Sequence, residues 1–458
     1  MRLPTSSPRR QGRGRATMRG VGALSYWHDS LAADDDLTPR PPLRGDTEVD
    51  VAIVGAGFTG LWTAHSLLRA DPNLRVLVLE RETAGFGASG RNGGWCVGMY
   101  SGPAGLVERR HGDGSYAAMS REMHRSVDEV GAAAAEAGID CQFRKSGAIN
   151  FAVNDGQRKR LRRLQRSLAG HGLGDAWRWL DAAEAEGIVH VEGIQGAVFS
   201  PHAAAIHPAR LARGLAVEVE RRGGTVAERT TVERIDGRRV RTDHGTVRAD
   251  VVVRATEGYT RTLDGHRRDV LPLGNTVIAT DPIDDATWAE IGLADRELFE
   301  LGVHMVAYGN RTADGRIVWG GLGAPTWWAS RIPTDPYDSD RVAAQLERSL
   351  VELFPALRGI TVSHRWGGVM GVPFDLLPGI GYDRDTGFAW AGGYTGQGVA
   401  TANAAGRGLA DLILDRDTDL TRLPWVGHRS PRWPPEPVRW AGVHGVTAAA
   451  RVADRRDG

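Results

Sequence analysis

The sequence predicts an α/β protein with two domains, and three observations support this. The chain has 458 residues, of which 41% are hydrophobic, and this length suffices for a large core. Residues 49–54 (VDVAIV) form a short apolar run that is typical of a strand buried on both faces of a parallel sheet. A glycine-rich turn, an amphipathic helical pattern over residues 61–70 and a second apolar run at residues 75–79 complete a βαβ unit.

The remaining elements follow from apolar periodicity and from the turn residues between periodic segments. Further helices are expected at residues 117–138, 157–168, 208–222, 287–291, 340–354 and in the segment after residue 398. Further strands are expected at residues 223–229, 231–236, 239–242, 247–248, 250–254, 275–280, 304–309, 316–321 and 388–390. Turn signals at residues 236–237 and 244–245 predict a β-meander over residues 231–248.

The two ends of the chain differ in composition from the rest. Residues 1–24 are rich in Arg, Pro, Ser and Gly and lack the apolar segment of a secretory signal, so we expect a disordered tail rather than a nucleic-acid or membrane arm. Ordered structure is expected to begin near residues 25–31. Residues 423–440 are rich in Pro and Trp and are expected to pack in an extended conformation, and residues 426–458 are expected to form a C-terminal strap.

Composition and charge exclude several classes of function. The formal net charge is +1, so the bulk charge does not indicate nucleic-acid binding. No run of about 18 or more apolar residues is present, so no membrane span is expected. Cys96 and Cys141 are too few for a disulfide framework or a cysteine-rich metal site. We therefore expect a cytoplasmic protein with no bound metal.

A G-x-G-x-x-G motif follows the first strand, as Gly55, Gly57 and Gly60, with Phe58 and Thr59 between the last two. In this context Gly55 permits a tight turn, Gly57 lets the backbone approach a pyrophosphate, and Gly60 permits close packing of helix and sheet. The pyrophosphate is expected at the N-terminus of the following helix, where free N–H groups and the helix dipole favour negative charge.

A ribose carboxylate and a second glycine-rich segment follow this unit. Glu80 ends the second strand and is expected to accept hydrogen bonds from ribose hydroxyls. Nicotinamide and flavin dinucleotides share the glycine motif, but the flexible loop ETAGFGASGRNGGW (82–95) favours wrapping of a second phosphate and a ring. Arg91 is expected to neutralise the pyrophosphate, the alternative being an ordinary surface-loop arginine. The cofactor contacts predicted here are Arg81, Ala88, Ser89, Gly90, Arg91, Asn92, Gly93 and Gly94.

These motifs resemble those of FAD-dependent amine oxidoreductases of the D-amino-acid-oxidase superfamily. The flavin loop GASGRNGG (87–94) is most similar to that of the gamma-glutamylputrescine oxidoreductases. Three later segments resemble family motifs in the same order: ADVVVRATEGYT (249–260), PFDLLPGIG (373–381) and WAGGYTGQGVATANAAGRGLAD (390–411). The resemblance spans residues 25–440 and implies FAD as cofactor. It adds the cofactor contacts Val232, Thr256, Gly393, Gly396, Gln397, Gly398 and Val399.

The resemblance also implies an architecture of two interleaved domains. A Rossmann-like FAD-binding domain is expected from residues 45–105, 195–270 and 365–425. A substrate-binding domain with a mixed sheet and helices is expected from residues 106–194 and 271–364.

The implied reaction is oxidation of a primary or secondary amine to an imine, with oxygen or another carrier as the final electron acceptor. A γ-glutamyl-polyamine is the substrate that the resemblance suggests. Tyr259, Tyr394 and Gln397 lie in flavin-proximal motifs and are the catalytic candidates. The N–H groups of residues 396–399 are expected to stabilise the negative charge that gathers on the reduced ring.

The sequence departs from relatives of the sarcosine-oxidase type at two positions. Those relatives attach their flavin through a cysteine upstream of the last motif, whereas no cysteine follows Cys141 here, so non-covalent FAD is expected. They also hold the substrate carboxylate with a lysine, and Ala400 occupies the corresponding position. Sarcosine is therefore not the expected substrate. Cys96 adjoins the flavin loop and is expected to be a small buried residue.

Two alternatives for the function stay open. An amino-acid oxidase or dehydrogenase of the same superfamily needs an arginine to bind the substrate carboxylate, and Arg331 and Arg365 are candidates. A subunit with the flavin fold but without turnover is the other. The residues that can line a channel for a cationic amine, or else pack in the core, are His304, Tyr308, Trp319, Trp327, Trp328 and Trp366.

Overall fold

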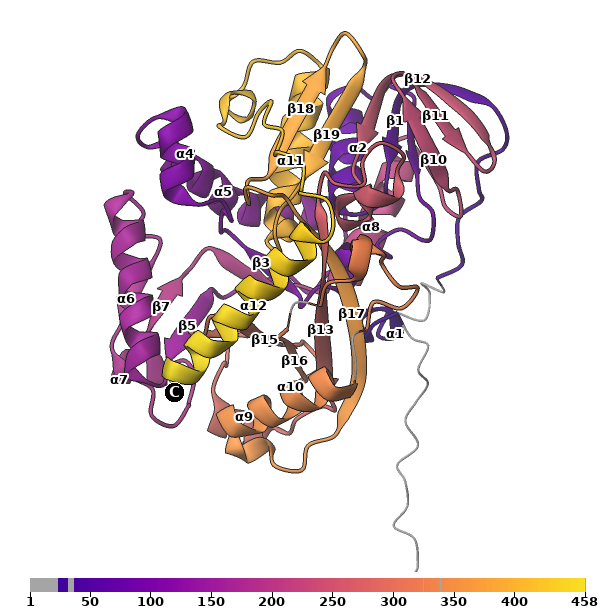
Figure 1. The fold of residues 1–458 in the computed structure, drawn as a ribbon. Coiled ribbons are helices and arrows are strands. Elements are labelled where there is room, and N and C mark those ends of the chain that lie inside the picture. Colours follow the sequence, from indigo (N-terminus) through magenta and orange to yellow (C-terminus); the bar gives the residue numbers. More distant parts are fainter. Residues whose placement is uncertain (1–23, 32–36, 324, 338–339, 458) are drawn as a thin grey trace, which may run out of the picture.

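Two eight-stranded sheets and one three-stranded sheet organise the chain (Figure 1). The computed structural model describes residues 24–31, 37–323, 325–337 and 340–457. The predicted disordered tail therefore lies, apart from Leu24, outside the described residues. The short helix α1 (Tyr26–Asp29), capped by the side chain of Ser25, begins where ordered structure was expected.

The first sheet contains the predicted βαβ unit and the predicted meander. Its strands lie in the order β10 (Val232–Asp236), β11 (Arg239–Thr242), β12 (Gly245–Arg254), β1 (Thr47–Val54), β2 (Val76–Leu79) and β9 (Thr225–Ala227), with β19 (Phe388–Gly392) beside β12 and β18 (Gly379–Asp383) beside β19. Strand β1 runs parallel to both β2 and β12. The strands predicted at residues 247–248 and 250–254 are one strand, because β12 pairs with β11 near its start and with β19 near its end.

Helices cover one face of the first sheet. Helix α2 (Phe58–Ala70) packs against α8 (Pro208–Arg221) and α11 (Gly398–Ile413), and α11 also contacts α5 (Ser115–Glu136). Gly406 of α11 allows the closest approach, because a Cβ atom there would lie 2.6 Å from the carbonyl carbon of Trp62. The apolar sides of these helices and of β1 and β2 form one large core, which confirms the helices predicted from periodicity.

The second sheet is mixed, as expected. Its strands lie in the order β17 (Val362–Val372), β13 (Leu271–Thr280), β16 (Ile317–Gly321), β15 (Ala307–Arg311), β14 (Leu298–Leu301), β5 (Ala148–Ala152), β7 (Gly196–Ser200) and β6 (Arg178–Leu180). Only the pair β14 and β5 is parallel among the pairs described here. The helices around it are α6 (Asp155–Gly170), α7 (Ala182–Glu186), α9 (Asp285–Ile291) and α10 (Asp340–Leu353).

Short elements join the two large sheets. The third sheet consists of β3 (Trp95–Val97), β8 (Ala203–Ala205) and β4 (Arg144–Lys145). The helices α3 (Ala88–Arg91) and α4 (Ala104–His111) and the 3-10 helices η1 (Glu257–Thr262), η2 (Trp328–Ser330), η3 (Pro355–Leu357) and η4 (Asp419–Arg422) complete the described elements before residue 438.

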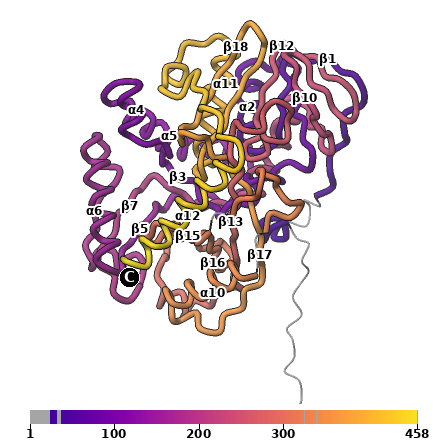
Figure 2. The backbone as a smooth tube through the Cα atoms, viewed as in Figure 1, coloured from indigo at the N-terminus to yellow at the C-terminus, as the bar shows by residue number. Residues whose placement is uncertain are grey.

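The second sheet draws on stretches that are far apart in the sequence. Figure 2 shows the magenta tube of β5 and β7 and the orange tube of β17 in the same half of the molecule. Strands β7 and β17 belong to this sheet, although they fall in segments that the sequence analysis assigned to the cofactor domain. The division into two interleaved domains stays a proposal, with these strands moved to the second.

The prediction of a strap over the C-terminal segment was wrong from residue 438 onward. Residues 438–457 form helix α12, which contacts α6 (Figure 1). The prolines of the segment end at Pro437, and the following residues are rich in Ala and Arg, which favour a helix. No helix in the described part of the chain combines the length and apolarity that crossing a membrane requires.

Candidate functional site

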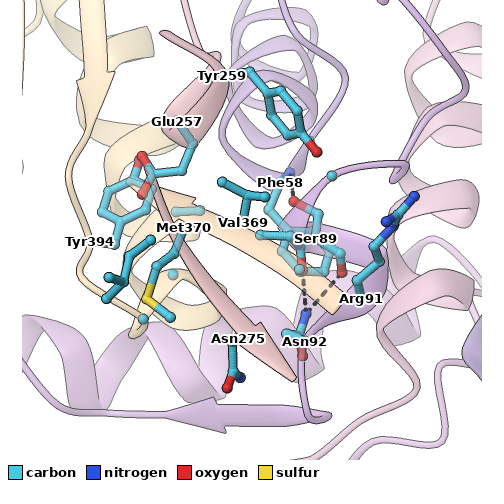
Figure 3. A pocket seen from close by; sticks show the side chains of 18 of the residues that line it. Phe58, Ser89, Arg91, Asn92, Glu257, Tyr259, Asn275, Val369, Met370 and Tyr394 are labelled. Carbon is cyan, nitrogen blue, oxygen red and sulfur yellow. Dashed lines mark hydrogen bonds between the residues drawn. The ribbon is translucent and has the colours of Figure 1, made fainter. Parts of the chain in front are cut away.

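A large cavity lies where residues of the two large sheets meet (Figure 3). Its volume is about 830 Å³, within the usual range for small-molecule and cofactor sites. The predicted residues that line it are Gly55, Gly57, Phe58, Thr59, Glu80, Arg81, Ala88, Ser89, Arg91, Asn92, Gly93, Val232, Thr256, Tyr259, Tyr394, Gly396, Gln397, Gly398 and Val399. Gly60, Gly90, Gly94 and Gly393 lie outside its lining.

The turn between β1 and α2 requires glycine at two positions. Gly55 has φ +106°, and a Cβ atom there would lie 2.6 Å from the carbonyl oxygen of Ala255. A Cβ atom at Gly60 would lie 1.9 Å from the carbonyl oxygen of Gly55. The strand and the helix can therefore approach only because these side chains are absent. Gly57 caps α2 without a side chain, and Gly57, Phe58 and Thr59 at this end of the helix line the cavity.

The carboxylate of Glu80 is held by the backbone at the end of β2. Its Oε2 accepts the N–H of Ala56 at 2.8 Å and its Oε1 accepts the N–H of Glu82 at 2.9 Å. Burial raises the pKa of Glu80, and these two hydrogen bonds oppose that shift. A carboxylate oxygen has two lone pairs, so each oxygen retains an acceptor site toward the cavity.

Arg91 is a buried residue of the cavity wall, which excludes the surface-loop alternative. Its side chain lies over the ring of Phe86 at 4.4 Å, and Nη1 donates to the carbonyl of Gly367 at 3.3 Å. Its Nε is buried and has no hydrogen-bond partner among the described residues. Desolvation lowers the pKa of Arg91. A buried guanidinium with an unused donor is suited to bind an anion.

Ser89 and Asn92 shape the loop that carries Arg91. Ser89 Oγ accepts the N–H of Phe58 at 2.8 Å, which joins the loop to the first turn of α2. Asn92 donates from Nδ2 to the carbonyl of Ser89 at 2.9 Å (Figure 3). Its Oδ1 accepts the N–H of Gly94 at 2.9 Å. Two segments that the sequence analysis treated as separate phosphate contacts are thus one hydrogen-bonded unit.

The turn between β19 and α11 forms another part of the cavity wall. Gly393 and Gly396 have φ +83° and +93°, which favour glycine. The N–H of Gln397 donates to the carbonyl of Tyr394 at 3.0 Å, so this N–H is not available to a ligand. Of the N–H groups of residues 396–399 that were expected to stabilise the ring, that of Gln397 is therefore excluded. Those of Gly398 and Val399 lie in the first turn of α11, where they have no acceptor within the helix.

Glu257 is a cavity residue that sequence reasoning missed. Its Oε2 accepts the N–H of Gly393 at 2.9 Å, and its Oε1 accepts the N–H of Gly371 at 3.3 Å. Burial raises the pKa of Glu257, and the backbone donors oppose this. Figure 3 shows it on the side of the cavity that also carries Tyr394 and Met370. The available signal was a charged residue inside the otherwise uncharged ATEGYT segment.

The two predicted tyrosines lie at different ends of the cavity. Tyr394 is 3% exposed, and its hydroxyl lies 2.9 Å from that of Thr59 in α2. Tyr259 lies under the guanidinium of Arg81 at 5.4 Å, next to the Glu80 end of the cavity. The sequence analysis expected both tyrosines near the cofactor. The structure shows that they lie in different parts of the cavity, one beside Arg81 and the other beside Thr59.

The second sheet supplies the other wall. Asn150, Glu300, Tyr308 and Asn275 line the cavity from four strands of this sheet, and His304 lies at its exposed edge. Asn275 donates from Nδ2 to the hydroxyl of Tyr308 at 2.5 Å. Of the expected channel residues, His304 and Tyr308 line the cavity; Trp319 and Trp366 are core residues, and Trp327 and Trp328 lie outside the lining. Arg331, Arg365 and Cys96 also lie outside it.

Comparison with known proteins gives consistent results. A family model described as FAD dependent oxidoreductase matches residues 50–412. Gamma-glutamylputrescine oxidoreductase of Escherichia coli (strain K12) is 29% identical to this chain, and the alignment covers 88% of this chain and 94% of that protein. Sarcosine oxidase subunit beta of an Arthrobacter species is 25% identical, over 75% of this chain and 83% of that protein. The crystal structure of glycine oxidase from Geobacillus kaustophilus shares the fold, with a TM-score of 0.69 at 22% identity over 83% of this chain and 99% of that one.

Proposed function

We propose that this chain, which belongs to the family of FAD dependent oxidoreductases, oxidises the C–N bond of a primary or secondary amine to an imine. A γ-glutamyl-polyamine is our first candidate, because a relative of similar length is named gamma-glutamylputrescine oxidoreductase. The proposal depends on one observation about the cavity. The glycine turn after β1 lines one side of it, and the second sheet lines the other with the carboxylate of Glu300 and, among the described residues, no guanidinium. The cytoplasmic location stays a prediction.

The residues of the cavity fit an FAD molecule. The N-terminus of α2 at Gly57 and the buried, incompletely paired guanidinium of Arg91 suit a pyrophosphate. Glu80, held by two backbone N–H groups, suits the hydroxyls of a ribose. We assign Tyr259 to this nucleotide end rather than to catalysis, because its neighbour is Arg81.

Bound FAD supplies the acceptor for a hydride from the carbon beside the amine nitrogen. The chain's own contribution is to position the amine and to favour negative charge on the ring. The N–H groups of Gly398 and Val399 and the dipole of α11 are the groups that we assign to the second task. Gln397 lines the cavity with a side chain that has no hydrogen-bond partner among the described residues, so it is free to bind the amine. The hydroxyl of Tyr394 is engaged by Thr59, so we assign its ring to the wall.

Non-covalent attachment of FAD is part of the proposal. Cys96 and Cys141 are buried at 0% and 1% exposure, and neither lines the cavity. Burial raises the pKa of the Cys141 thiol to about 11 and raises that of Cys96 as well, so neither supplies a thiolate at neutral pH. Denaturation in acid should therefore release all of the flavin into the supernatant.

The amino-acid oxidase alternative has less support in the structure. Its two candidate arginines lie outside the cavity: Arg365 is within 3.6 Å of Asp340 and 3.7 Å of Glu347, and Arg331 is exposed. The guanidinium groups that line the cavity, among the described residues, are those of Arg81 and Arg91. Both come from the nucleotide half, so no arginine is placed for the carboxylate of an α-amino acid.

An anaerobic titration of the purified protein tests the proposal. The flavin absorbance should bleach with polyamines or γ-glutamyl-polyamines and should return when oxygen or a quinone is added. Bleaching only by α-amino acids would establish the amino-acid oxidase alternative instead. Correctly folded protein that takes up no FAD would establish the alternative of a subunit without turnover.

A further inference from the structure

Glu300 presents a carboxylate to the cavity from the middle of the second sheet. It lies on β14, where it pairs with Asn150 of β5 on one side and with Tyr308 of β15 on the other. Residues paired across neighbouring strands point to the same face, and all three line the cavity. Adjacent strands lie about 4.8 Å apart, so these side chains form one continuous polar row.

Two of the three side chains in this row, Glu300 and Asn150, have acceptor oxygens without a donor in the protein, whereas the hydroxyl of Tyr308 accepts from Asn275. Glu300 is half-buried and has no hydrogen bond and no ion pair among the described residues, and Asn150 Oδ1 is buried without a partner. Most buried polar groups in folded proteins are paired, since each unpaired group costs about 1–3 kcal/mol. A buried amide oxygen without a donor, next to a carboxylate that lines the same cavity, therefore points to a ligand that supplies the donors.

The surroundings of the row favour a cation over a neutral donor. No Arg or Lys contributes to the cavity from the second sheet or its loops, as far as these are described. Tyr308 and Trp95 meet edge to face with ring centroids 5.5 Å apart, and both line the cavity. A carboxylate, an amide oxygen and aromatic rings together suit an ammonium group. Leu164 and Met305 add apolar lining that suits a methylene chain.

We propose that Glu300 and Asn150 bind a second ammonium group of the substrate, separate from the amine that is oxidised. The substrate class is then a diamine, or an acylated diamine whose acyl part carries an amino group. This inference rests on the proposed amine oxidation and adds to it the group that selects the substrate. Glu300 binds and positions the substrate and takes no part in the transfer itself.

The comparison of a diamine with a monoamine of equal length tests the subsite. With 1,4-diaminobutane, the wild-type protein should show kcat/KM about 10- to 100-fold above that with butylamine, the gain that a hydrogen bond to a charged group gives. In Glu300→Gln this preference should fall to near unity through a rise in KM for 1,4-diaminobutane. Glu297→Gln, the same change outside the cavity lining, should keep the preference.

A second variant and a second pair of ligands test the subsite independently of the Glu300 substitution. Asn150→Leu should reduce the preference several-fold without a change of charge. A γ-glutamyl-diamine should exceed the matching glutaryl-diamine, which lacks the amino group. Flavin absorbance and melting temperature report whether each variant is folded.

The pH dependence offers a readout that a structural role would not give. Burial raises the pKa of Glu300 to about 7, so the carboxylate loses its charge as pH falls below that value. The wild-type preference for the diamine should fall below pH 7, and that of Glu300→Gln should stay flat. His304 and Tyr308 also face this wall and Arg160 lies behind His304, but all are present in both proteins.

The outcomes separate this inference from the proposed function. Equal efficiency with diamine and monoamine in the wild type, or an unchanged preference in Glu300→Gln, overturns the subsite and leaves amine oxidation standing. Failure of every amine to bleach the wild-type flavin overturns both.

Discussion

The hydroxyl groups of Thr59 and Tyr394 lie 2.9 Å apart, although 335 positions separate the two residues. Thr59 belongs to the first turn of α2, and Tyr394 belongs to the turn that precedes α11. This contact joins the two glycine-rich turns that line the cavity.

Tyr394→Phe should weaken FAD binding without abolishing turnover. The change removes one buried hydrogen bond, whose net contribution is about 0.5–1.5 kcal/mol, so the Kd for FAD should rise about 2- to 12-fold. Quenching of flavin fluorescence on addition to the apoprotein measures this. Thr59→Val should have a similar effect, and the double variant should add little to either. Loss of turnover with unchanged FAD affinity would instead assign the Tyr394 hydroxyl to catalysis.

Glu257→Ala should destabilise the protein and promote loss of flavin. The change leaves the N–H groups of Gly371 and Gly393 without their acceptor, and each such loss costs about 1–3 kcal/mol. Glu257→Gln keeps one acceptor oxygen, so its effect should be smaller. Chemical denaturation, followed by flavin absorbance, measures the free energy of unfolding of both variants. Equal stability of wild type and Glu257→Ala would show that the hydrogen bonds from Gly371 and Gly393 to Glu257 contribute nothing to the free energy of unfolding.

Glu300→Gln should stabilise the protein above neutral pH. The pKa of Glu300 is raised from 4.5 to about 7 in the folded state, so the folded state binds the proton more tightly than the unfolded state. Stability from this group is present below pH 4.5 and is lost as pH rises to 7. Allowing for solvent screening, Glu300→Gln should gain about 1–3 kcal/mol at pH 8 and nothing at pH 4.

The exposed Glu186 provides the matched control for this measurement. Glu186→Gln should leave the stability at pH 8 within about 0.5 kcal/mol of the wild type. A stabilisation that is the same at pH 4 and pH 8 would contradict the raised pKa of Glu300. Together with the expected loss of substrate preference, the result would show that this carboxylate is retained for binding at a cost in stability.

Asp454→Ala should loosen the segment that forms the exposed edge of the cavity. The carboxylate of Asp454 in α12 accepts the N–H groups of His304 at 2.6 Å and Met305 at 2.8 Å. Without it, amide hydrogen exchange in residues 302–306 should accelerate about 10-fold or more, and KM should rise several-fold. Arg455→Ala, an exposed neighbour, should change neither. Unchanged exchange in residues 302–306 would show that α12 does not hold this segment.

Several features of the first sheet and its glycine turn could be predicted, because each depends on a short segment of the sequence. Gly55 and Gly60 follow from the sterics of one strand–turn–helix unit, and Glu80 follows from the end of the next strand. The helix after Pro437 was missed, because the prolines and tryptophans before it led to the prediction of an extended strap. The strand at residues 362–372 was missed because its glycines weaken a pattern that only pairing with β13 stabilises.

The sequence by itself therefore determined the α/β class, the dinucleotide turn and the family, since these depend on short segments whose backbone geometry a few glycines and apolar residues dictate. Only the tertiary structure decided which side chains share the cavity. Asn150 and Glu300 become neighbours through a parallel pairing between distant strands, and Tyr259 and Tyr394 are separated by the same folding. Such contacts depend on the burial of whole surfaces, which no short segment of the chain encodes.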